Sequence, residues 1–448
     1  MITSSATSQR VGKRVAVTGM GVVTPIGIGV SAFAEGLFSG RSGVGPITVF
    51  DPATLPTRIA AQVDLSSQAD ARDLPYRDRK VAFALMAAEQ AMRDASSCGS
   101  TPSGVGSGST PSGVGRGSTP FGDGGGIAMG VGLELFSMED LVAFRKPGFE
   151  LPRERYARLT FLQTPSDVCV HLLSARHGFR TPPLVLVSAC AAGTDALGTA
   201  FRLVASGRRR FMLAGVTDSM INPLGVAGFC TLMATSTKND TPTRASRPFD
   251  RSRDGFVLGE GAGVLVLEAW DDAVARGATI HAEIAGYGTS FDAYGISEPH
   301  PEGRGAAQAM SRAIASAGLT PDDIDVVNAH GTGTPKNDPA ETLAIHRVFG
   351  QRARTIPVCA TKSMIGHLIS AAGAVEAVAA ILGMQRGLLH PNPNLDELDE
   401  ACPLDVVGKQ ARALTHRTVI SNSFGFGGQN AAIVLKSAER TADRSGDA

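Results

Sequence analysis

The chain has 448 residues, 43% of them hydrophobic, and its 42 basic residues balance its 42 acidic ones. A chain of this length exceeds what one simple core supports, so we expect two domains or two fused halves. Zero net charge argues against nucleic acid as a main partner, and no apolar run is long enough to cross a membrane.

The cysteines are scattered along the chain and form no CxxC pairs. They are Cys98, Cys169, Cys190, Cys230, Cys359 and Cys402. This usage is typical of a reducing cytoplasm and carries no metal-binding signature, so we expect a cytoplasmic protein without a metal. The first ten residues are polar and lack an apolar core, so we expect no secretory signal.

The first element is a predicted strand over residues 14–18, followed by a glycine-rich stretch over 19–27 that we interpret as a turn. Such a turn can bind a dinucleotide, but the GxGxxG spacing and the acidic residue that should follow it are absent. Helices are expected over 30–39 and 78–94, the second with a clear apolar stripe.

Residues 99–125 read as three nine-residue copies, GSTPSGVGS, GSTPSGVGR and GSTPFGDGG. This composition cannot bury enough apolar area to offset the entropy of ordering it, so we predict a mobile surface loop. The units are too short and too polar to form a solenoid. A strand is expected to follow over 127–131, and a helix over 166–177.

Cys190 follows a run of apolar and β-branched residues over 184–187, which predicts a buried parallel strand. Residues 191–204 then have helical spacing, which places Cys190 at a strand-to-helix turn. Free backbone N–H groups and the helix dipole favour a thiolate there. Small neighbouring residues leave room for a substrate beside the sulfur. A buried structural cysteine is the alternative for an isolated Cys.

Strands and helices alternate through the rest of the chain, which indicates parallel or mixed sheets covered by helices. Strands are expected over 210–214, within 249–266, and over 280–286, 325–329, 356–360, 418–422 and 431–435. Helices are expected over 305–317, 340–349 and 369–384, with another ending at 273–276. The polar tail over 438–448 is expected to be frayed.

Three polar segments follow predicted strands and should meet at one edge of the sheet. Asn-Ala-His-Gly-Thr-Gly-Thr contains His330, and Thr-Lys-Ser-Met-Ile-Gly-His contains Lys362 and His367. Residues 422–430, NSFGFGGQN, have alternating glycines that let backbone N–H groups approach a ligand. With Cys190 these segments supply a nucleophile, two imidazoles, an ammonium group and backbone donors. That set suits carbon–carbon bond formation at a thioester.

The four motifs SACAAGTDA, NAHGTGT, TKSMIGH and NSFGFGG, in this order, resemble the signatures of the decarboxylating β-ketoacyl-acyl-carrier-protein synthases. The chain most resembles the elongating synthase II of bacterial fatty-acid synthesis and is close to the ketosynthase subunit of type II polyketide systems. The resemblance covers residues 13–436 apart from the repeat. It implies a thiolase-like α/β fold with two duplicated halves in five layers, α-β-α-β-α. The halves would be 13–270, with the nucleophile, and 271–437, with the other three motifs.

The resemblance also implies that the chain is an enzyme with defined catalytic residues. Cys190 would accept the acyl chain from an acyl-carrier protein as a thioester. His330 and His367 would donate hydrogen bonds to the malonyl carbonyl and stabilise the enolate formed as carbon dioxide leaves. Lys362 would add positive charge beside them, paired with Glu341, because an unpaired buried lysine is costly. The product would be a 3-oxoacyl chain on the carrier protein, formed by Claisen condensation.

Other positions match substrate-binding positions of the family. The backbone N–H groups of Cys190 and Phe426 would form the oxyanion hole, and Phe426 would also be the gate for the acyl chain. The substrate-binding residues are Thr332 and Thr334 for the phosphopantetheine arm, Phe229 and Leu133 for the acyl tunnel, and Phe424. Arg79 and Lys80 match carrier-protein docking positions, while Met233 replaces a frequent docking arginine. No cofactor is implied, because phosphopantetheine on the carrier protein holds the substrates.

The acyl substrate and the pathway stay open at this stage. Residues 295–297, Glu134 and Asp195 depart from the pattern of the elongating synthases. A type II polyketide ketosynthase is therefore an alternative. A non-catalytic chain-length subunit would lack the nucleophile that Cys190 provides. A thiolase would use a second cysteine as base, and a cysteine hydrolase would lack the Lys362 motif. We expect a homodimer, with a heterodimer containing a chain-length subunit as the alternative.

Overall fold

The computed structural model describes residues 12–68, 78–97, 124–132 and 168–438. The predictions for the nine-residue repeat up to residue 123, for Leu133, for Glu134 and for the tail from residue 439 lie outside these ranges. No helix in the described part of the chain is both long enough and apolar enough to cross a lipid bilayer.

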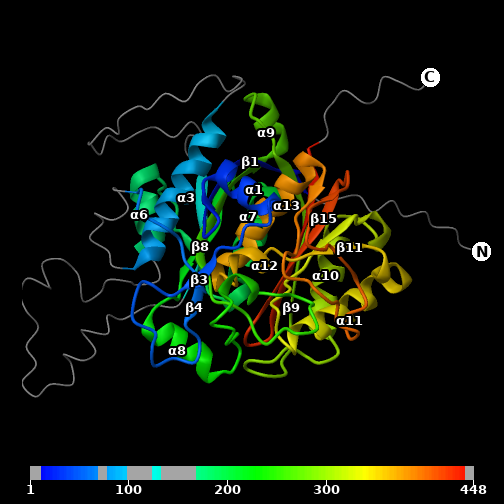
Figure 1. The fold of residues 1–448 in the computed structure, drawn as a ribbon. Helices are drawn as coiled ribbons and strands as arrows, with labels where there is room; N and C mark the ends of the chain where they lie inside the picture. The colour runs from blue at the N-terminus through cyan, green and yellow to red at the C-terminus, as the bar shows by residue number, and fades with distance from the viewer. Residues whose placement is uncertain (1–11, 69–77, 98–123, 133–167, 439–448) are drawn as a thin grey trace, which may run out of the picture.

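A large mixed sheet forms the centre of the fold (Figure 1). Its strands follow the order β13-β11-β10-β15-β16-β9-β1-β8-β7-β5-β6. Those of the first half are β1 Val15–Thr24, β5 Gly125–Val131, β6 Leu184–Leu186, β7 Phe211–Ser219 and β8 Glu260–Ala269. Those of the second half are β9 Ala282–Phe291, β10 Val326–Asn328, β11 Pro357–Cys359, β13 Asp405–Val406, β15 Thr418–Gly425 and β16 Gln429–Ser437.

The two halves repeat one topology. The order β6-β5-β7-β8-β1 in the first half matches β11-β10-β15-β16-β9 in the second. In both, the first three strands pair in parallel and the remaining neighbours pair antiparallel. An antiparallel pairing of β1 with β9 joins the halves. The expected duplicated α/β fold is therefore confirmed.

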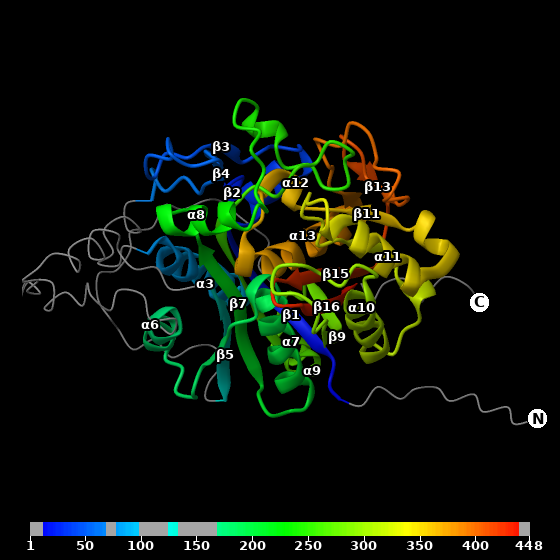
Figure 2. The same ribbon diagram turned by 90° about the horizontal axis from the view of Figure 1, so that it is seen from below.

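Helices complete the layers on both sides of the two half-sheets (Figure 2). Helix α3 Arg79–Ser96 covers β1 and β8 from outside, and α10 Arg304–Ser316 covers β9 and β16. Helices α7 Ala192–Ala205 and α13 Ala372–Arg386 contact each other and strands of both halves. They form the middle layer, which gives the five layers expected from the resemblance.

The remaining elements are short or peripheral. The helices are α1 Val30–Phe38, α6 Val168–His177, α8 Pro223–Thr231, α9 Trp270–Ala275, α11 Asn337–Phe349 and α12 Lys362–Ile365. The 3-10 turns are η2 Ala189–Ala191, η3 Pro242–Arg244, η4 Pro321–Asp323, η5 Gly350–Arg354 and η6 Ile369–Ala371. The small strands are β2 Gly27–Ile28, β3 Val44–Pro46, β4 Ile59–Ala61, β12 Leu388–Leu389 and β14 Arg412–Ala413.

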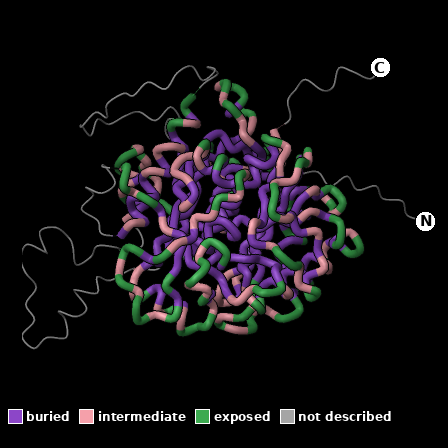
Figure 3. The backbone as a smooth tube through the Cα atoms, in the orientation of Figure 1, coloured by how far each residue is buried: buried purple, intermediate pink, exposed green. Residues whose placement is uncertain are grey.

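Helix α13 shows why the middle layer consists of small residues. Its sequence, AGAVEAVAAILGMQR, is rich in alanine and glycine, and all its residues from Ala372 to Met384 are buried. Small side chains let a helix lie at close range between the two half-sheets, where a layer of large side chains would hold them apart. Figure 3 shows the resulting buried interior, with exposed residues at its margin.

Most of the glycine-rich stretch over 19–27 is strand rather than the expected turn, because β1 continues to Thr24, and the turn is confined to Pro25 and Ile26 before β2. Gly19 and Gly21 face helix α3. A β-carbon at Gly19 would lie 2.1 Å from the carbonyl oxygen of Ala91, and one at Gly21 would lie 1.9 Å from that of Ala87. These glycines therefore allow helix and strand to approach closely.

The strand before Cys190 is partly exposed, although the sequence predicted a buried strand. Strand β6 lies at the end of the sheet order and pairs only with β5 among the described strands. Leu184 is 39% exposed and the following Val187 is 64% exposed. An apolar run alone does not distinguish a central strand from an edge strand.

We predict that Gly19→Ala lowers the free energy of unfolding by about 1–3 kcal/mol, because its methyl group overlaps the α3 backbone. Gly45→Ala is the matched control, since a β-carbon there meets no atom within 4 Å. The midpoint of urea denaturation measures both changes. Equal midpoints for the two variants would contradict the role given to Gly19.

Candidate active site

Cys190 lies on a sharp turn between β6 and α7. The turn, η2, spans Ala189–Ala191, and Cys190 is only 2% exposed. Ala189 adopts the left-handed conformation, with φ of 48°. A residue with a β-carbon is strained in this region of backbone space, so surrounding contacts must hold the turn in place.

The thiol meets two imidazoles that come from the other half of the fold. Nε2 of His367 lies 3.1 Å from Sγ of Cys190. The rings of His330 and His367 have centroids 5.2 Å apart and stand nearly perpendicular, at 83°. One nitrogen of each ring and the sulfur all lie within 4.8 Å of one another. The structure thus brings together three residues that are up to 177 positions apart in the chain.

These three groups form the set of donors best placed to hold a metal among the described residues. A thiolate and two imidazoles can bind a soft ion such as Zn²⁺. The ammonium group of Lys362 lies against His330, however, and its charge disfavours a cation at this position.

The site residues of the second half lie in loops and turns that follow the carboxyl ends of its strands. His330 follows β10, and Lys362 begins α12 just after β11. Strands β10, β11 and β15 are parallel, so their carboxyl ends lie at one edge. His367 comes one residue after Gly366, whose φ of 67° ends α12 and turns the chain back toward Cys190.

The hydrogen bonds around the two rings fix which nitrogen carries the proton. Nδ1 of His367 accepts from the backbone N–H of Ile369 at 3.1 Å. Nζ of Lys362 lies 3.3 Å from Nδ1 of His330 and, as an ammonium group, can only donate to it. Both rings therefore carry hydrogen on Nε2. Burial lowers the pKa of both histidines, and the charge of Lys362 lowers it further, so both are neutral donors.

Burial favours the thiol form of Cys190, whereas the turn by itself predicts a thiolate. Burial raises the pKa of Cys190 to about 11. The backbone N–H of Phe426 beside the sulfur, together with the charge of Lys362, opposes this shift. Desolvation outweighs these donors because the Cys190 side chain is almost completely buried.

Lys362 has a different partner from the one expected. Its Nζ donates to Oε1 of Glu376 on α13, at 2.5 Å, and both side chains are buried. Glu341 instead accepts from the backbone N–H groups of His330 and Gly331, each at 2.8 Å. It fixes the loop that carries His330. The signal for Glu376 was a single acid in an otherwise apolar, alanine-rich helix.

An apolar cluster surrounds the sulfur. Phe229 belongs to it, as expected, and its ring centroid lies 6.3 Å from that of Phe426. Phe256, which the sequence did not single out, packs on Phe229 at 5.6 Å and on His367 at 5.3 Å. The other buried members of this cluster are Ile47, Ala60, Met220, Ile221, Val226, Leu258 and Ile369. The cluster is suited to an acyl chain.

Phe424, Thr332 and Thr334 lie near His330 and are not members of the apolar cluster around Cys190. The ring of Phe424 lies 5.7 Å from the His330 ring, so it packs against the donor group. The hydroxyls of Thr332 and Thr334 are 2.9 Å apart on the loop that follows His330. Thr332 is buried and Thr334 is half-buried.

The expected docking role is wrong for Lys80, which is buried, and stays a prediction for Arg79, whose side chain is 26% exposed. The guanidinium group of Arg79 donates to Oε1 of Glu260 at 2.6 Å. Lys80 is 1% exposed, and its Nζ lies 3.0 Å from Oδ2 of Asp78. Both residues stand in the first turn of α3, where tertiary packing directs them to buried carboxylates. Pattern alone could not show this.

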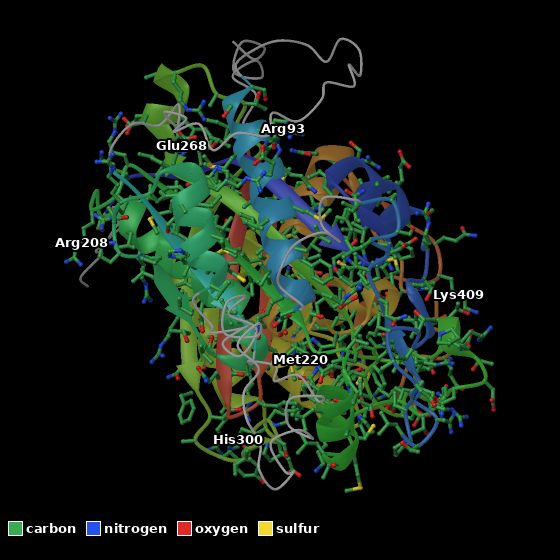
Figure 4. The ribbon with its side chains drawn as sticks, turned by 90° about the vertical axis from the view of Figure 1, so that its left-hand side faces the viewer. Arg93, Arg208, Met220, Glu268, His300 and Lys409 are labelled. Atoms are coloured by element: carbon green, nitrogen blue, oxygen red, sulfur yellow. The ribbon has the colours of Figure 1, made fainter. Side chains whose placement is uncertain are left out.

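The three consecutive arginines at 208–210 lie away from the site. They precede β7, whose nine residues extend roughly 30 Å before the chain reaches the apolar cluster around Cys190. Figure 4 shows Arg208 well separated from Met220, a member of that cluster.

Comparisons with family models and with known proteins point to the same family. A model described as the β-ketoacyl synthase N-terminal domain matches residues 12–273, and its C-terminal counterpart matches 281–396. The chain is 39% identical to the 3-oxoacyl-[acyl-carrier-protein] synthase 2 of Synechocystis sp., over 95% of this chain and 98% of that one. It is also 39% identical to the putative polyketide beta-ketoacyl synthase 1 of Streptomyces cyaneus, over 94% and 98%.

Solved structures agree with this family. A β-ketoacyl synthase from Burkholderia phymatum superposes with a TM-score of 0.81 at 35% identity, covering 95% of this chain and all of that chain. A type II polyketide acyl-carrier protein in complex with its ketosynthase bound to the hexaketide gives a TM-score of 0.79 at 30% identity, with the same coverage.

We predict that Glu376→Leu lowers the free energy of unfolding by about 3–5 kcal/mol, because it leaves the Lys362 charge buried without a partner. The double variant Lys362→Met, Glu376→Leu should recover most of that loss. Urea denaturation measures the coupling between the two positions.

The matched comparison is the cycle of Lys362→Met with Glu341→Leu, the pair expected from the sequence. That cycle should show little coupling. Stronger coupling of Lys362 to Glu341 than to Glu376 would refute the observed pairing.

Proposed function

This chain belongs to the β-ketoacyl synthase family, and we propose that it is a decarboxylating condensing enzyme that extends an acyl chain carried by an acyl-carrier protein. The observation that carries the proposal is the meeting of the Cys190 thiol with two neutral imidazoles that both carry hydrogen on Nε2. A nucleophile beside two fixed donors suits acyl transfer followed by enolate formation.

In the first step, Sγ of Cys190 attacks the carbonyl carbon of the incoming thioester. A carbon–sulfur bond forms to Cys190, and the bond to the phosphopantetheine sulfur breaks. The proton of the thiol ends on the departing phosphopantetheine thiol, so the step is balanced. The backbone N–H of Phe426, which already points at the sulfur, and that of Cys190 stabilise the oxyanion.

In the second step, malonyl-carrier protein occupies the site beside the acylated cysteine. The Nε2–H groups of His330 and His367 donate to its thioester carbonyl while the bond to the carboxylate breaks and carbon dioxide leaves. The electron pair left behind forms the enolate, whose carbon attacks the acyl-Cys190 carbonyl. The carbon–sulfur bond to Cys190 then breaks, and the sulfur takes up a proton from solvent.

The orientation and tautomer of each imidazole depend on the group that contacts its Nδ1 atom. The ammonium group of Lys362 occupies Nδ1 of His330, and the backbone N–H of Ile369 occupies Nδ1 of His367. These contacts keep the donating hydrogen on the side of the substrate. The chemistry needs no cofactor of its own, since both substrates arrive on a phosphopantetheine arm.

We propose a role in fatty-acid elongation, with a type II polyketide ketosynthase as the second candidate. The second candidate is kept because identity to the Streptomyces cyaneus polyketide relative equals that to the Synechocystis synthase. A non-catalytic chain-length subunit is disfavoured, because Cys190 is present and in contact with His367. The free state of all described cysteines supports a reducing compartment, and we propose the cytoplasm.

We expect the wild-type protein, given fatty acyl-carrier proteins of graded length and malonyl-carrier protein, to yield 3-oxoacyl products two carbons longer. Cys190→Gln should abolish condensation yet keep malonyl decarboxylation, because the amide mimics an acylated cysteine while both histidines stay in place. Mass spectrometry of the carrier proteins measures both reactions.

The failures in this experiment have separate meanings. Absence of an extended product with every fatty chain would remove the fatty-acid assignment. Loss of decarboxylation together with condensation in Cys190→Gln would contradict the separate role given to His330 and His367. The variant His367→Ala is the control that should lose decarboxylation.

We also propose that two copies of the chain pair through β6. This strand carries the exposed Leu184, is followed by the exposed Val187, and lies at the end of the sheet order among the described strands. Pairing of two such edges would join the sheets of two copies and shield these side chains.

We predict that Leu184→Arg shifts the protein from dimer to monomer, because it places charge on the proposed interface. Sedimentation velocity measures the change. Leu343→Arg is the matched control, since Leu343 is a similarly exposed leucine (46%) on α11. A monomeric wild-type protein, or equal dissociation by both variants, would rule out this interface.

A further inference from the structure

Asp195 has no role in the reaction described above, yet it makes two short contacts beside the site. It stands in the first turn of α7. Its Oδ2 accepts from the hydroxyl of Ser188 at 2.5 Å, and its Oδ1 accepts from the hydroxyl of Tyr287 at 2.6 Å. Ser188 lies two residues before Cys190, whereas Tyr287 belongs to β9 in the other half.

Ser188 is the residue from which the strained turn begins. Its carbonyl oxygen accepts from the backbone N–H of Ala191 at 3.0 Å, which closes the turn around Ala189 and Cys190. The same carbonyl oxygen lies 3.0 Å from where a β-carbon at Gly425 would be. The turn is therefore wedged between its own helix and the glycine loop of the second half.

Tyr287, which donates to Asp195, is itself held firmly in place. It is 5% exposed, and a β-carbon at Gly198 would lie 2.3 Å from its ring, so the ring fills a notch in α7. The guanidinium carbon of Arg202 stands 4.6 Å from the ring centroid. A ring held from two sides presents its hydroxyl to Asp195 with little freedom.

We propose that Asp195 is a positioning residue that ties the Ser188 end of the Cys190 turn to Tyr287 and so holds the sulfur within reach of His367. The left-handed φ of Ala189 would relax if the Ser188 end were released, because no other described residue makes a hydrogen bond to the Ser188 side chain. The role rests on the proposed function, since its purpose is to present the thiol to the thioester.

The contacts point to hydrogen bonding as the basis of this role, with the charge of Arg202 acting on the carboxylate from a longer distance. Both partners of the carboxylate are neutral hydroxyls that donate to it. An amide in its place can accept from one hydroxyl and donate to the other, because each hydroxyl can rotate. A methyl group can do neither, so Asp195→Asn and Asp195→Ala should differ.

The experiment compares Asp195→Ala, Asp195→Asn and Ser188→Ala with the control Ser206→Ala. Ser206 caps the other end of α7, where its hydroxyl donates to the carbonyl oxygen of Leu203. Three readouts are used: the rate at which iodoacetamide alkylates Cys190, the rate of acyl transfer to Cys190, and malonyl decarboxylation measured in the Cys190→Gln background.

We expect Asp195→Ala to slow acyl transfer by about 10- to 100-fold, because small displacements of a nucleophile have costs of this size. Alkylation of Cys190 should also change in rate, while decarboxylation changes by less than about 3-fold, since the histidines belong to the other half. Ser188→Ala should reproduce the effect, and the double variant should add little. Asp195→Asn and Ser206→Ala should stay near the wild type.

Two results would overturn the proposal. One is unchanged acyl transfer in both Asp195→Ala and Ser188→Ala. The other is a parallel loss of acyl transfer and decarboxylation, which would indicate general unfolding. If Asp195→Ala does not fold, the acyl-transfer and decarboxylation rates of Ser188→Ala test the proposal without it. If the wild type is not acylated by any carrier protein, the proposed function fails, whereas alkylation of Cys190 still reports on the turn.

Discussion

The ion pair between Lys362 and Glu376 is the interaction on which the site depends. It holds a full positive charge inside a region from which water is excluded, and such a charge is stable only with a partner at hydrogen-bond distance. From this position Lys362 occupies Nδ1 of His330 and lowers the pKa of both imidazoles. That charge, together with burial and the backbone N–H of Ile369 at Nδ1 of His367, gives the two neutral Nε2–H donors.

The duplication of the fold explains why such a site can exist at all. Each half ends its parallel strands at one edge, and the antiparallel pairing of β1 with β9 fixes the halves side by side. One half presents Cys190 on a strained turn, and the other presents His330 and His367 on loops after its own strands. Close packing by small residues, such as those of α13, brings the nucleophile and the donors into contact.

Burial has opposite consequences for the two kinds of group. For the histidines it favours the neutral form that donates a hydrogen bond, which suits enolate stabilisation. For Cys190 it favours the thiol and opposes the helix N-terminus, so attack must be coupled to departure of the proton. Precise placement of the sulfur therefore matters more here than its acidity, and this gives the hydrogen bonds of Asp195 their importance.

Local sequence determined the order of strands and helices. It also identified Cys190, His330, Lys362 and His367, because each of them lies in a short motif whose residues are close together in the chain. The tertiary structure alone decided which carboxylate neutralises Lys362. It also decided that Gly19 and Gly21 lie within β1 and serve helix packing, that β6 ends the sheet order among the described strands, and that Arg79 and Lys80 are held by buried acids. Each of these depends on contacts between segments far apart in the chain, and a local pattern of apolar, small or charged residues is the same whichever partner folding brings to it.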